Sequence, residues 1–513
     1  MSIECKWLNG ICRLLYWGQY RRFVAPCSVE AVQTDYLLKL LRRNRDTVYG
    51  RKYGFRDIKT YEDFVQRVPL TCYEDYEPYI DAAAKGEKHV LTSEKIMLFE
   101  LTSGSSGGKK KIPYTRSLKR EFQRGIKPWL CDLYTNIKGV DSGKSYWSIT
   151  PVTTKRSYTE AGIPVGFEED AEYFGFIEQG IMRKIFAVDG SVKFSQDMAD
   201  FYRKTVRQLL QCSELTLISV WNPTFLTILC DFIGENALEF AELFPEDKRE
   251  PFLQAAQAGR FDRIFPELKI ISCWADGSAA DYIAEVEKRF PGVYIQPKGL
   301  LATECFISFP MTGEQGSRLS IYSHFFEFRR LSDGRIVTAG DLSTGEYEVI
   351  VTTGGGFYRY CIGDIIEVLE VYSDRPPRIR FLHRKGISSD LFGEKLTEEF
   401  VRSVCVKLGI AESFCLLAPE GRHYCLYTTA LGVTGDMLDK ALSEGYHYDY
   451  CRKLGQLDKA SVIRVGGNPQ KEYITRLSKE GMRTGDIKPA YLSRKSGWQH
   501  YFEIVEERKG END

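Results

Sequence analysis

The chain has 513 residues and a balanced charge, with 70 Lys and Arg against 70 Asp and Glu. This balance gives no case for binding nucleic acid or an acidic membrane surface, and the length predicts two domains. A hydrophobic content of 43%, with 30 Tyr and 30 Phe, is enough for large cores and excludes long disordered stretches.

Fourteen cysteines are scattered without a Cys-x-x-Cys pair, which argues against a zinc site or a thioredoxin-like centre. Single cysteines of this kind are mostly buried apolar residues, so we expect a reducing, cytoplasmic location. The first 24 residues are interrupted by Lys6, Arg13, Arg21 and Arg22 and lack the apolar core of a signal peptide. Because no run approaches the roughly 18 apolar residues of a membrane span, we expect no membrane partner.

The elements predicted along the chain change character twice. The first hundred residues indicate helices, including one over 34–45 with Leu37, Leu40 and Leu41. From 96 to 381, helices alternate with short apolar strands, which is typical of α/β layers. The clearest predicted strands are 96–99, 215–221, 268–273, 293–296, 347–352 and 378–383.

The pattern changes again near Arg384, after a polar segment at 373–377. The elements predicted beyond it are a helix at 397–408, strands at 414–418 and 423–428, a helix at 435–444 and a strand at 461–465. This order predicts a small α+β domain of about 130 residues.

A loop rich in Ser and Gly follows the strand predicted at 96–99. Residues 103–108 read Ser-Gly-Ser-Ser-Gly-Gly, and Lys109, Lys110 and Lys111 come next. Small residues allow backbone N–H groups to surround an anion. The loop is not of the Walker A type, because no Ser or Thr follows the lysines to hold magnesium. It is interpreted as a triphosphate loop of another kind, the alternative being a polar turn.

Two later motifs favour the nucleotide interpretation. Thr303-Glu304 follows an apolar run, and the segment 358–364 (Tyr-Arg-Tyr-Cys-Ile-Gly-Asp) follows the strand at 347–352 and a glycine triplet. A glutamate is a hard oxygen ligand that suits Mg²⁺. An aspartate just after a strand can accept hydrogen bonds from both ribose hydroxyls. A phosphate loop, a Thr-Glu pair and then Gly-Asp is the order expected of adenylate-forming enzymes.

Through these motifs the chain resembles the auxin-responsive Gretchen Hagen-type acyl-acid amido synthetases, and their bacterial branch more than the plant branch. The resemblance covers nearly the whole chain. Its further blocks are 61–71, 161–166, 219–225, 297–304 and 452–457. It implies an α/β fold with a large adenylate-forming N-terminal domain over 1–384 and a smaller, mobile α+β cap domain over 385–513.

The resemblance also implies a two-step reaction that uses ATP and Mg²⁺. A small carboxylic acid attacks the α-phosphate of ATP, giving an acyl-adenylate and pyrophosphate. An amine, expected to be an amino acid, then takes the acyl group and releases AMP. The first step needs no base, because a carboxylate is already ionised near neutral pH. It needs charge neutralisation and in-line positioning.

Matching residues acquire roles from this resemblance. Thr303 is expected near the α-phosphate, Glu304 at Mg²⁺ and Asp364 at the ribose. The residues assigned to the phosphate loop are Ser103, Gly104, Ser105, Ser106 and Gly108, with Lys110 as the catalytic lysine. The candidate acyl-pocket residues are Thr159, Ile163, Pro164 and Val165, whereas Trp221, Phe225 and Phe306 are equally acceptable as core residues.

Three basic residues have two interpretations each. Arg359 either contacts phosphate or is a structural ion-pair partner. Arg384 either lies near the ribose and the hinge or is a surface residue after a strand. Lys488 either reaches the adenylate on cap closure or is a solvated loop residue.

Some positions depart from the family pattern. Leu300 stands where the plant family carries a tyrosine, so an adenine that stacks there in relatives needs another partner here. Cys305 is interpreted as a packing residue, and His324 and His383 as structural histidines. Two other functions stay open: an acyl-CoA ligase, and a non-catalytic acyl-acid or nucleotide binder. The oligomeric state and the base of the amine step are not predicted.

Overall fold

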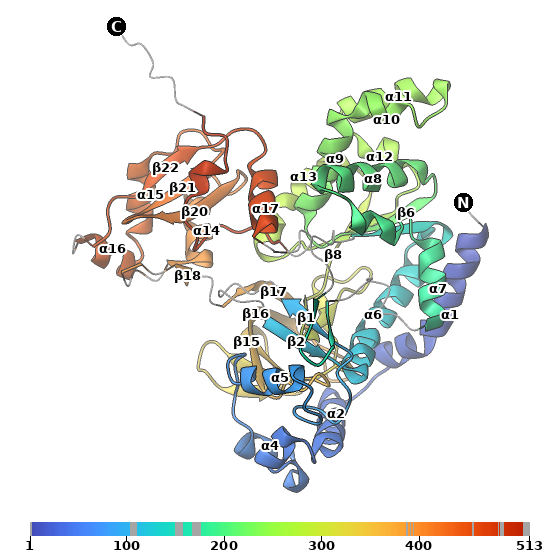
Figure 1. Cartoon of the computed structure of the whole chain (residues 1–513), viewed down its shortest axis with the longest axis vertical. Coiled ribbons are helices and arrows are strands. Elements are labelled where there is room, and N and C mark those ends of the chain that lie inside the picture. Colours follow the sequence, from blue (N-terminus) through green and yellow to red (C-terminus); the bar gives the residue numbers. More distant parts are fainter. Residues whose placement is uncertain are drawn as a thin grey trace. The chain divides into compact units, whose positions relative to one another are not determined.

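The computed structural model describes residues 3–102, 110–148, 157–166, 176–385, 388–389, 391–392, 394, 396–453, 456–480, 482 and 487–505. The chain divides into two compact units (Figure 1). The large unit comprises Met1–Trp221, Leu229–Asp276 and Glu287–Leu382, and the small unit comprises Asn222–Ile228, Gly277–Val286 and His383–Asp513. Two short segments that the sequence analysis assigned to the first domain therefore group with the second, and the boundary after 384 stays a prediction.

Helices dominate the first hundred residues, as expected. They are α1 (Ile3–Val24), α2 (Val29–Asn44), α3 (Val48–Lys52), α4 (Tyr61–Arg67) and α5 (Glu77–Ala84). Side-chain caps fix where they begin: Ser28 caps α2, and Thr60 and Asp63 form a reciprocal capping box at α4. Helix α6 (Arg116–Asn136) begins at the cap Thr115 and packs against α1 (Figure 1).

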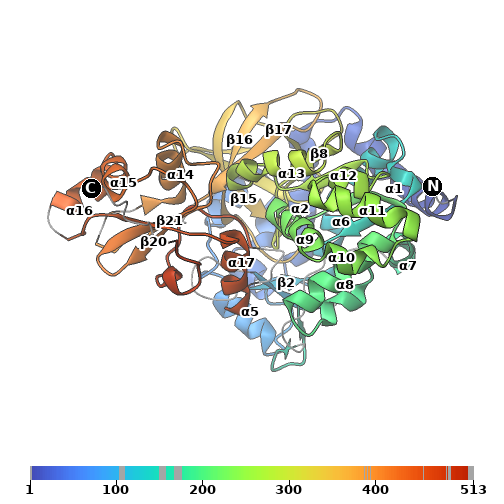
Figure 2. The same ribbon diagram turned by 90° about the horizontal axis from the view of Figure 1, so that it is seen from above.

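A four-stranded parallel sheet with the order β3-β6-β7-β8 forms one part of the large unit. Its strands are β3 (Lys144–Trp147), β6 (Leu215–Ser219), β7 (Ile270–Cys273) and β8 (Tyr294–Pro297). The last three lie close to the predicted ranges, whereas β3 was not predicted. Every residue of β6 and β7 is buried, which is typical of parallel strands covered on both faces. The helices between these strands are α7 (Phe176–Ile185), α8 (Met198–Gln211), α9 (Pro223–Glu235), α10 (Ala237–Ala241), α11 (Glu246–Gln257), α12 (Phe261–Ile264) and α13 (Ile283–Arg289) (Figure 2).

The second sheet of the large unit has seven strands in the order β11-β12-β17-β16-β15-β13-β14. They are β11 (Ser308–Phe309), β12 (Ser317–Leu319), β13 (Phe325–Arg330), β14 (Ile336–Thr338), β15 (Gly345–Thr352), β16 (Tyr360–Glu370) and β17 (Arg378–Arg384). The pairs β11–β12, β12–β17, β13–β14, β13–β15 and β15–β16 are antiparallel. The predicted alternation of helices and strands up to 381 is wrong over this region, because antiparallel strands need only short turns and no crossover helix.

A third, mixed sheet has the order β2-β1-β5-β4. Its strands are β1 (Leu98–Thr102), β2 (Lys110–Tyr114), β4 (Ser157–Tyr158) and β5 (Pro164–Val165). A separate two-stranded hairpin joins β9 (Leu301–Ala302) to β10 (Cys305–Phe306). A large apolar core, which includes Leu37, Phe326, Val349 and Leu300, connects the first helices to the seven-stranded sheet.

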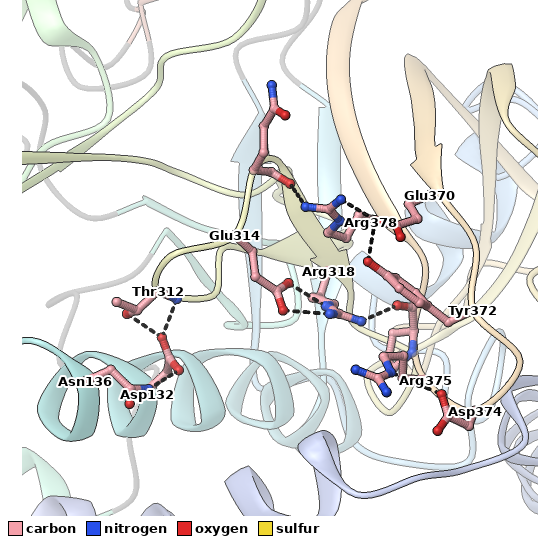
Figure 3. A network of polar contacts seen from close by, with 12 residues as sticks. Asp132, Asn136, Thr312, Glu314, Arg318, Glu370, Tyr372, Asp374, Arg375 and Arg378 are labelled. Atoms are coloured by element: carbon pink, nitrogen blue, oxygen red, sulfur yellow. Dashed lines mark hydrogen bonds and ion pairs between the residues drawn. The ribbon is translucent and has the colours of Figure 1, made fainter.

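A network of polar contacts fixes the loop before β12 at both of its ends (Figure 3). At one end, the Asp132 carboxylate of α6 accepts hydrogen bonds from the backbone N–H and the hydroxyl of Thr312, at 2.7 and 2.6 Å. At the other end, buried Arg318 donates two hydrogen bonds of 2.6 Å to Glu314 and lies 4.6 Å above the ring centre of Tyr372. These contacts hold the seven-stranded sheet against α6.

The small unit has its own core around a three-stranded sheet of order β20-β21-β22. The strands are β20 (Cys415–Glu420), β21 (His423–Thr428) and β22 (Ser461–Arg464), with a separate pair β18 (Ser388–Ser389) and β19 (Leu396–Thr397). The helices are α14 (Glu398–Lys407), α15 (Gly435–Leu442), α16 (Tyr446–Lys453) and α17 (Pro469–Lys479). None of the helices in the described ranges combines the length and apolar character needed to cross a bilayer.

Candidate active site

Thr303 and Glu304 form the tip of the β9–β10 hairpin. Ala302 pairs with Cys305 across a two-residue turn, so the predicted motif is held on a rigid hairpin and not on a loose loop. Glu304 is 4% exposed and Thr303 is half-buried. Cys305, directly after the turn, is completely buried and packs in the large core, as a packing residue would.

A buried histidine anchors this hairpin. The backbone N–H of Phe306 donates to Nε2 of His324 at 2.9 Å, so that nitrogen carries no proton. Nδ1 of His324 lies 3.0 Å from Glu121 Oε2, and Tyr36 donates to the same carboxylate at 2.6 Å. Burial alone would raise the pKa of Glu121, but the hydrogen bonds that it accepts lower it. His324 therefore has a structural role behind the hairpin.

The same carboxylate reaches the glycine triplet that precedes the Gly-Asp motif. Glu121 Oε2 accepts the backbone N–H of Gly354 at 2.9 Å. A Cβ at Gly354 would lie 2.3 Å from Glu121 Oε1, so only glycine permits this close approach. One buried residue on α6 thus connects the Thr-Glu hairpin, through His324, to the glycine triplet.

The candidate phosphate loop connects β1 to β2, which pair with Thr102 opposite Lys110. The predicted loop residues Ser103, Gly104, Ser105, Ser106 and Gly108 lie outside the described residues. Lys110 is described: it is half-buried, and its ammonium lies 5.0 Å from the ring centre of Tyr73. The candidate catalytic lysine is therefore placed at the end of the loop by a strand.

Tyr73 is a site residue that the sequence analysis missed. Its hydroxyl accepts the backbone N–H of Lys111 at 2.7 Å and donates to the carbonyl of the same residue at 3.3 Å. Burial, with smaller contributions from the negative charges of Glu77, Asp81 and Glu304, raises the pKa of Tyr73 to about 12. A protonated Tyr73 thus lies beside Lys110 and the backbone of Lys111. Nothing in its local sequence indicates this, because the neighbours come from distant segments.

The candidate acyl-pocket residues lie next to the phosphate-loop strands. Strands β4 and β5 form a hairpin, closed by a hydrogen bond of 3.1 Å from the Ile163 N–H to the Thr159 hydroxyl. Val165 in β5 pairs with Phe99 in β1. Ile163 and Val165 also pack against the large core. Thr159, Ile163, Pro164 and Val165 are thus brought to the same sheet as Lys110, whereas Phe225 and Phe306 are almost fully buried core residues.

The sequence suggested that Asp364 follows a strand, but the structure places it inside β16. The pairing of β15 with β16 shifts at this point, so that Ile362, Gly363 and Asp364 lie opposite the single residue Val349. Gly363 has φ of 80°, in the left-handed region that favours glycine. Such a bulge re-aims a side chain, and here it does so at the residue expected to bind the ribose. The Asp364 side chain is 5% exposed.

Two of the predicted basic residues belong to the small unit. Arg384 is the last residue of β17 and is half-buried. Lys488 has an exposed side chain, and its carbonyl accepts a hydrogen bond of 3.3 Å from Tyr473 of α17. The charge of Lys488 acts on Glu398, the first residue of α14. His383, the second histidine interpreted as structural, has its Nε2 3.1 Å from Glu399 Oε2.

The side chains available to bind Mg²⁺ in the described part of the chain are few. No group of three or more His, Cys, Asp and Glu residues suited to a metal ion occurs in the described part of the chain. Mg²⁺ in nucleotide sites usually needs only one or two carboxylates, because phosphate oxygens and waters complete its coordination. A single buried carboxylate such as Glu304 fits this requirement.

Two plant amido synthetases are similar in sequence to this chain. The chain is 23% identical over 429 residues to a putative indole-3-acetic acid-amido synthetase GH3.10 of Oryza sativa subsp. japonica, covering 78% of this chain and 87% of the relative. It is 22% identical over 451 residues to the indole-3-acetic acid-amido synthetase GH3.3 of Arabidopsis thaliana, covering 78% and 74%.

Solved structures show the same fold. AtGH3.15 acyl acid amido synthetase in complex with 2,4-DB superimposes with a TM-score of 0.78 at 19% identity, covering 97% of this chain and 98% of that one. A 2-hydroxyisobutyryl-CoA ligase in its postadenylation state gives 0.50 at 15% identity, covering 93% and 91%.

Two family models match the chain. The model of the GH3 family N-terminal domain matches residues 25–248, and the model of the GH3 family central domain matches residues 318–384. Together they span more than half of the sequence, and the chain therefore belongs to the GH3 family.

Proposed function

We propose that this protein is an ATP-dependent acyl-acid amido synthetase, which adenylates a small carboxylic acid and transfers the acyl group to the amine of an amino acid. The observation that carries the proposal is that strands hold the motif residues: Lys110 begins β2, Thr303 and Glu304 form the tip of the β9–β10 hairpin, and Asp364 lies at the bulge in β16. The relatives named as amido synthetases support the same activity.

In the adenylation step, the chain's own groups bind and neutralise. Lys110 supplies a positive charge beside the segment assigned to the phosphate loop, which is Ser103, Gly104, Ser105, Ser106 and Gly108. Mg²⁺, when bound, would neutralise phosphate charge, and Glu304 is the carboxylate that would hold it. Thr303 and Asp364 are proposed at the α-phosphate and the ribose. Tyr73 keeps its proton near neutral pH and fixes β2 through the backbone of Lys111.

The second step is assigned to the small unit. We propose the region after 384 as a cap, with Arg384 at its hinge and Lys488 as the residue that reaches the acyl-adenylate. The cap of about 130 residues has its own core, which is what a rigid moving domain needs. The cysteines are scattered and mostly buried, as packing residues are, which supports a reducing cytoplasmic setting for the reaction.

The test is pyrophosphate release from ATP and Mg²⁺ with a panel of carboxylic acids, with and without pooled amino acids. Acid-dependent release, with AMP and an amide formed only when amino acids are present, is the expected result. Formation of a thioester with coenzyme A instead would establish an acyl-CoA ligase. ATP binding in calorimetry without any release would indicate a non-catalytic binder.

A further inference from the structure

A row of side chains crosses the parallel sheet of the large unit near its carboxyl edge. Trp147 in β3 pairs with Ser219 in β6, Ser219 with Ser272 in β7, and Ser272 with Gln296 in β8. Residues paired in register on parallel strands present their side chains to the same face of the sheet. Lys298 follows Gln296 by two positions and extends this face. The carboxyl edge of parallel strands is where ligands bind in open α/β sheets.

The ammonium of Lys298 is buried in a cage of aromatic rings. Lys298 is 8% exposed. Nζ lies 4.9 Å from the ring centre of Trp221, 5.1 Å from that of Trp129 and 5.8 Å from that of Trp147. Such distances are typical of cation–π contacts. Trp147 and Trp221 are only half-buried, so the cage is less covered on their side than at Trp129.

Lys298 has hydroxyl partners but no carboxylate partner in the part of the chain that the structure describes. Nζ donates to Ser219 Oγ at 2.7 Å, and Ser272 Oγ lies at 3.4 Å. The neighbouring Cys273 is not a counter-ion, because burial raises the pKa of its thiol to about 12. Burial correspondingly lowers the pKa of Lys298 to about 7. A buried ammonium without an anion is costly, and the cost disappears when an anion binds beside it.

A second buried donor lies next to it. Gln296 is fully buried, and its Oε1 accepts a hydrogen bond of 3.0 Å from Trp129 Nε1. Its Nε2 has no hydrogen-bond partner among the residues that the structure describes. Buried donors are rarely left in this state unless a water, an ion or a ligand completes them. Lys298 and Gln296 share the Trp129 ring, so the ammonium and the amide offer two donors within one small region.

We propose that Lys298 and Gln296 form a binding site for a carboxylate group of the acid substrate, with Trp129, Trp147 and Trp221 as its walls. A carboxylate has two acceptor oxygens, which match one ammonium and one amide donor. The inference rests on the proposed function for the identity of the ligand. The carboxylate is either the group that reacts with ATP or a second carboxylate at the far end of a diacid, and experiment separates the two.

Carboxylate binding here has a signature that a structural lysine lacks. The bound anion stabilises the charged form of Lys298, so at pH 8 the complex takes up protons from solution. Isothermal titration calorimetry detects this uptake as a dependence of the heat on the ionisation enthalpy of the buffer. This measurement needs only the wild-type protein.

The variant Lys298→Met keeps the length of the side chain and removes the donor. Replacing a buried amine by an apolar chain of similar size should not lower the melting temperature. Lys288→Met is the matched control, because Lys288 is exposed on α13. The probes are three monoacids, benzoate, hexanoate and indole-3-acetate, and two diacids, terephthalate and adipate. Binding of each acid and of its uncharged amide is measured by the quenching of tryptophan fluorescence.

The wild type and Lys288→Met are expected to bind at least one acid about tenfold more tightly than its amide, with proton uptake. Lys298→Met loses both the preference and the uptake. A preference restricted to the diacids assigns the site to a second carboxylate. The proposal is overturned if Lys298→Met keeps the preference, or if no acid changes the emission of the wild type. Pyrophosphate release that is equally fast in both proteins rejects this site and leaves the proposed function intact.

Discussion

Arg359 and Glu327 form an ion pair in the interior of the large unit. Nη2 of Arg359 lies 2.9 Å from Oε1 of Glu327, and the two side chains are 4% and 1% exposed. Nε of the same guanidinium contacts both carboxylate oxygens, and Nη1 donates to the carbonyl of Val68 at 2.9 Å. Of the two sequence interpretations of Arg359, the structure places it as the ion-pair partner.

The backbone of Arg359 supports this role. Its φ of 51° lies in the left-handed region, which is unusual for a residue with a side chain. The conformation is held by a hydrogen bond from its N–H to Thr352 Oγ1 at 2.9 Å and one from the Thr71 N–H to its carbonyl at 3.0 Å. Arg359 thus connects the segment before α5 to the strands β15 and β16, close to the Gly-Asp motif.

Arg359→Ala should lower the free energy of unfolding by about 3–5 kcal/mol, because it leaves the buried Glu327 carboxylate without its counter-ion and with only a neutral donor, the Tyr61 hydroxyl, among the described residues. Urea denaturation followed by fluorescence measures this change. Arg335→Ala, at an exposed turn, is the control and should stay within about 0.5 kcal/mol of the wild type. Wild-type stability combined with a tenfold rise in the KM for ATP would instead show that Arg359 contacts phosphate.

Glu304→Gln should reduce acid-dependent pyrophosphate release by about 100-fold, which is the usual size of the effect when one transition-state charge contact is lost. The amide keeps the volume of the side chain at the hairpin tip but is a much poorer ligand for Mg²⁺. The coupled pyrophosphate assay gives the rate, and circular dichroism checks the fold. Glu287→Gln on α13, whose carboxylate is exposed, should retain the full rate. A rate within threefold of the wild type for Glu304→Gln would remove this residue from the mechanism.

Lys488→Ala should lower kcat by about 100-fold and change the Kd for ATP by less than twofold, since the proposed contact forms only after the cap closes. Single-turnover kinetics and ATP calorimetry separate the two quantities. Lys479→Ala, at the exposed end of α17, is the matched control. Unchanged turnover in Lys488→Ala would identify Lys488 as a solvated loop residue.

The sequence predicted where the strands begin and end far better than which strands lie next to one another. Strand β21 matches its predicted range, and β6, β7 and β8 differ from theirs by one or two residues at an end. These strands are short apolar runs bounded by polar residues, a pattern that is local in the sequence. The antiparallel sheet after β10 was not predicted, because the order of strands in a sheet leaves no local pattern.

The same distinction applies to the site. Thr303, Glu304 and Lys110 could be named as candidates because their motifs are continuous in sequence. Tyr73 and Lys298 could not, because their roles depend on residues that the sheets bring together from distant segments. Whether Arg359 contacts phosphate or forms a structural ion pair depends on whether Glu327, 32 positions away, faces its side chain. Only the pairing of β13 with β15, and of β15 with β16, decides that question.

Glu398 links the ionisation of the small unit to Lys488. It accepts the backbone N–H of Tyr491 at 3.0 Å, and burial raises the pKa of its carboxyl from 4.5 to about 7, against the opposing effects of this hydrogen bond and of the Lys488 and Arg402 charges. Between pH 4.5 and pH 7 the folded protein therefore holds a proton that the unfolded chain releases.

The free energy of unfolding should accordingly fall as the pH rises through this window, by at most about 1.4 kcal/mol per pH unit, and level off above pH 7. Glu398→Gln still accepts the Tyr491 hydrogen bond but cannot ionise, so its melting temperature should lose this component of the pH dependence. Glu412→Gln, at an exposed position of the small unit, controls for the loss of one carboxylate. Melting curves of the full chain at half-unit steps from pH 4.5 to 8 decide the matter: identical slopes for the wild type and Glu398→Gln would mean that the Glu398 carboxyl ionises normally. Lys488→Ala should move the upper end of the window to higher pH, because it removes a charge that favours the carboxylate.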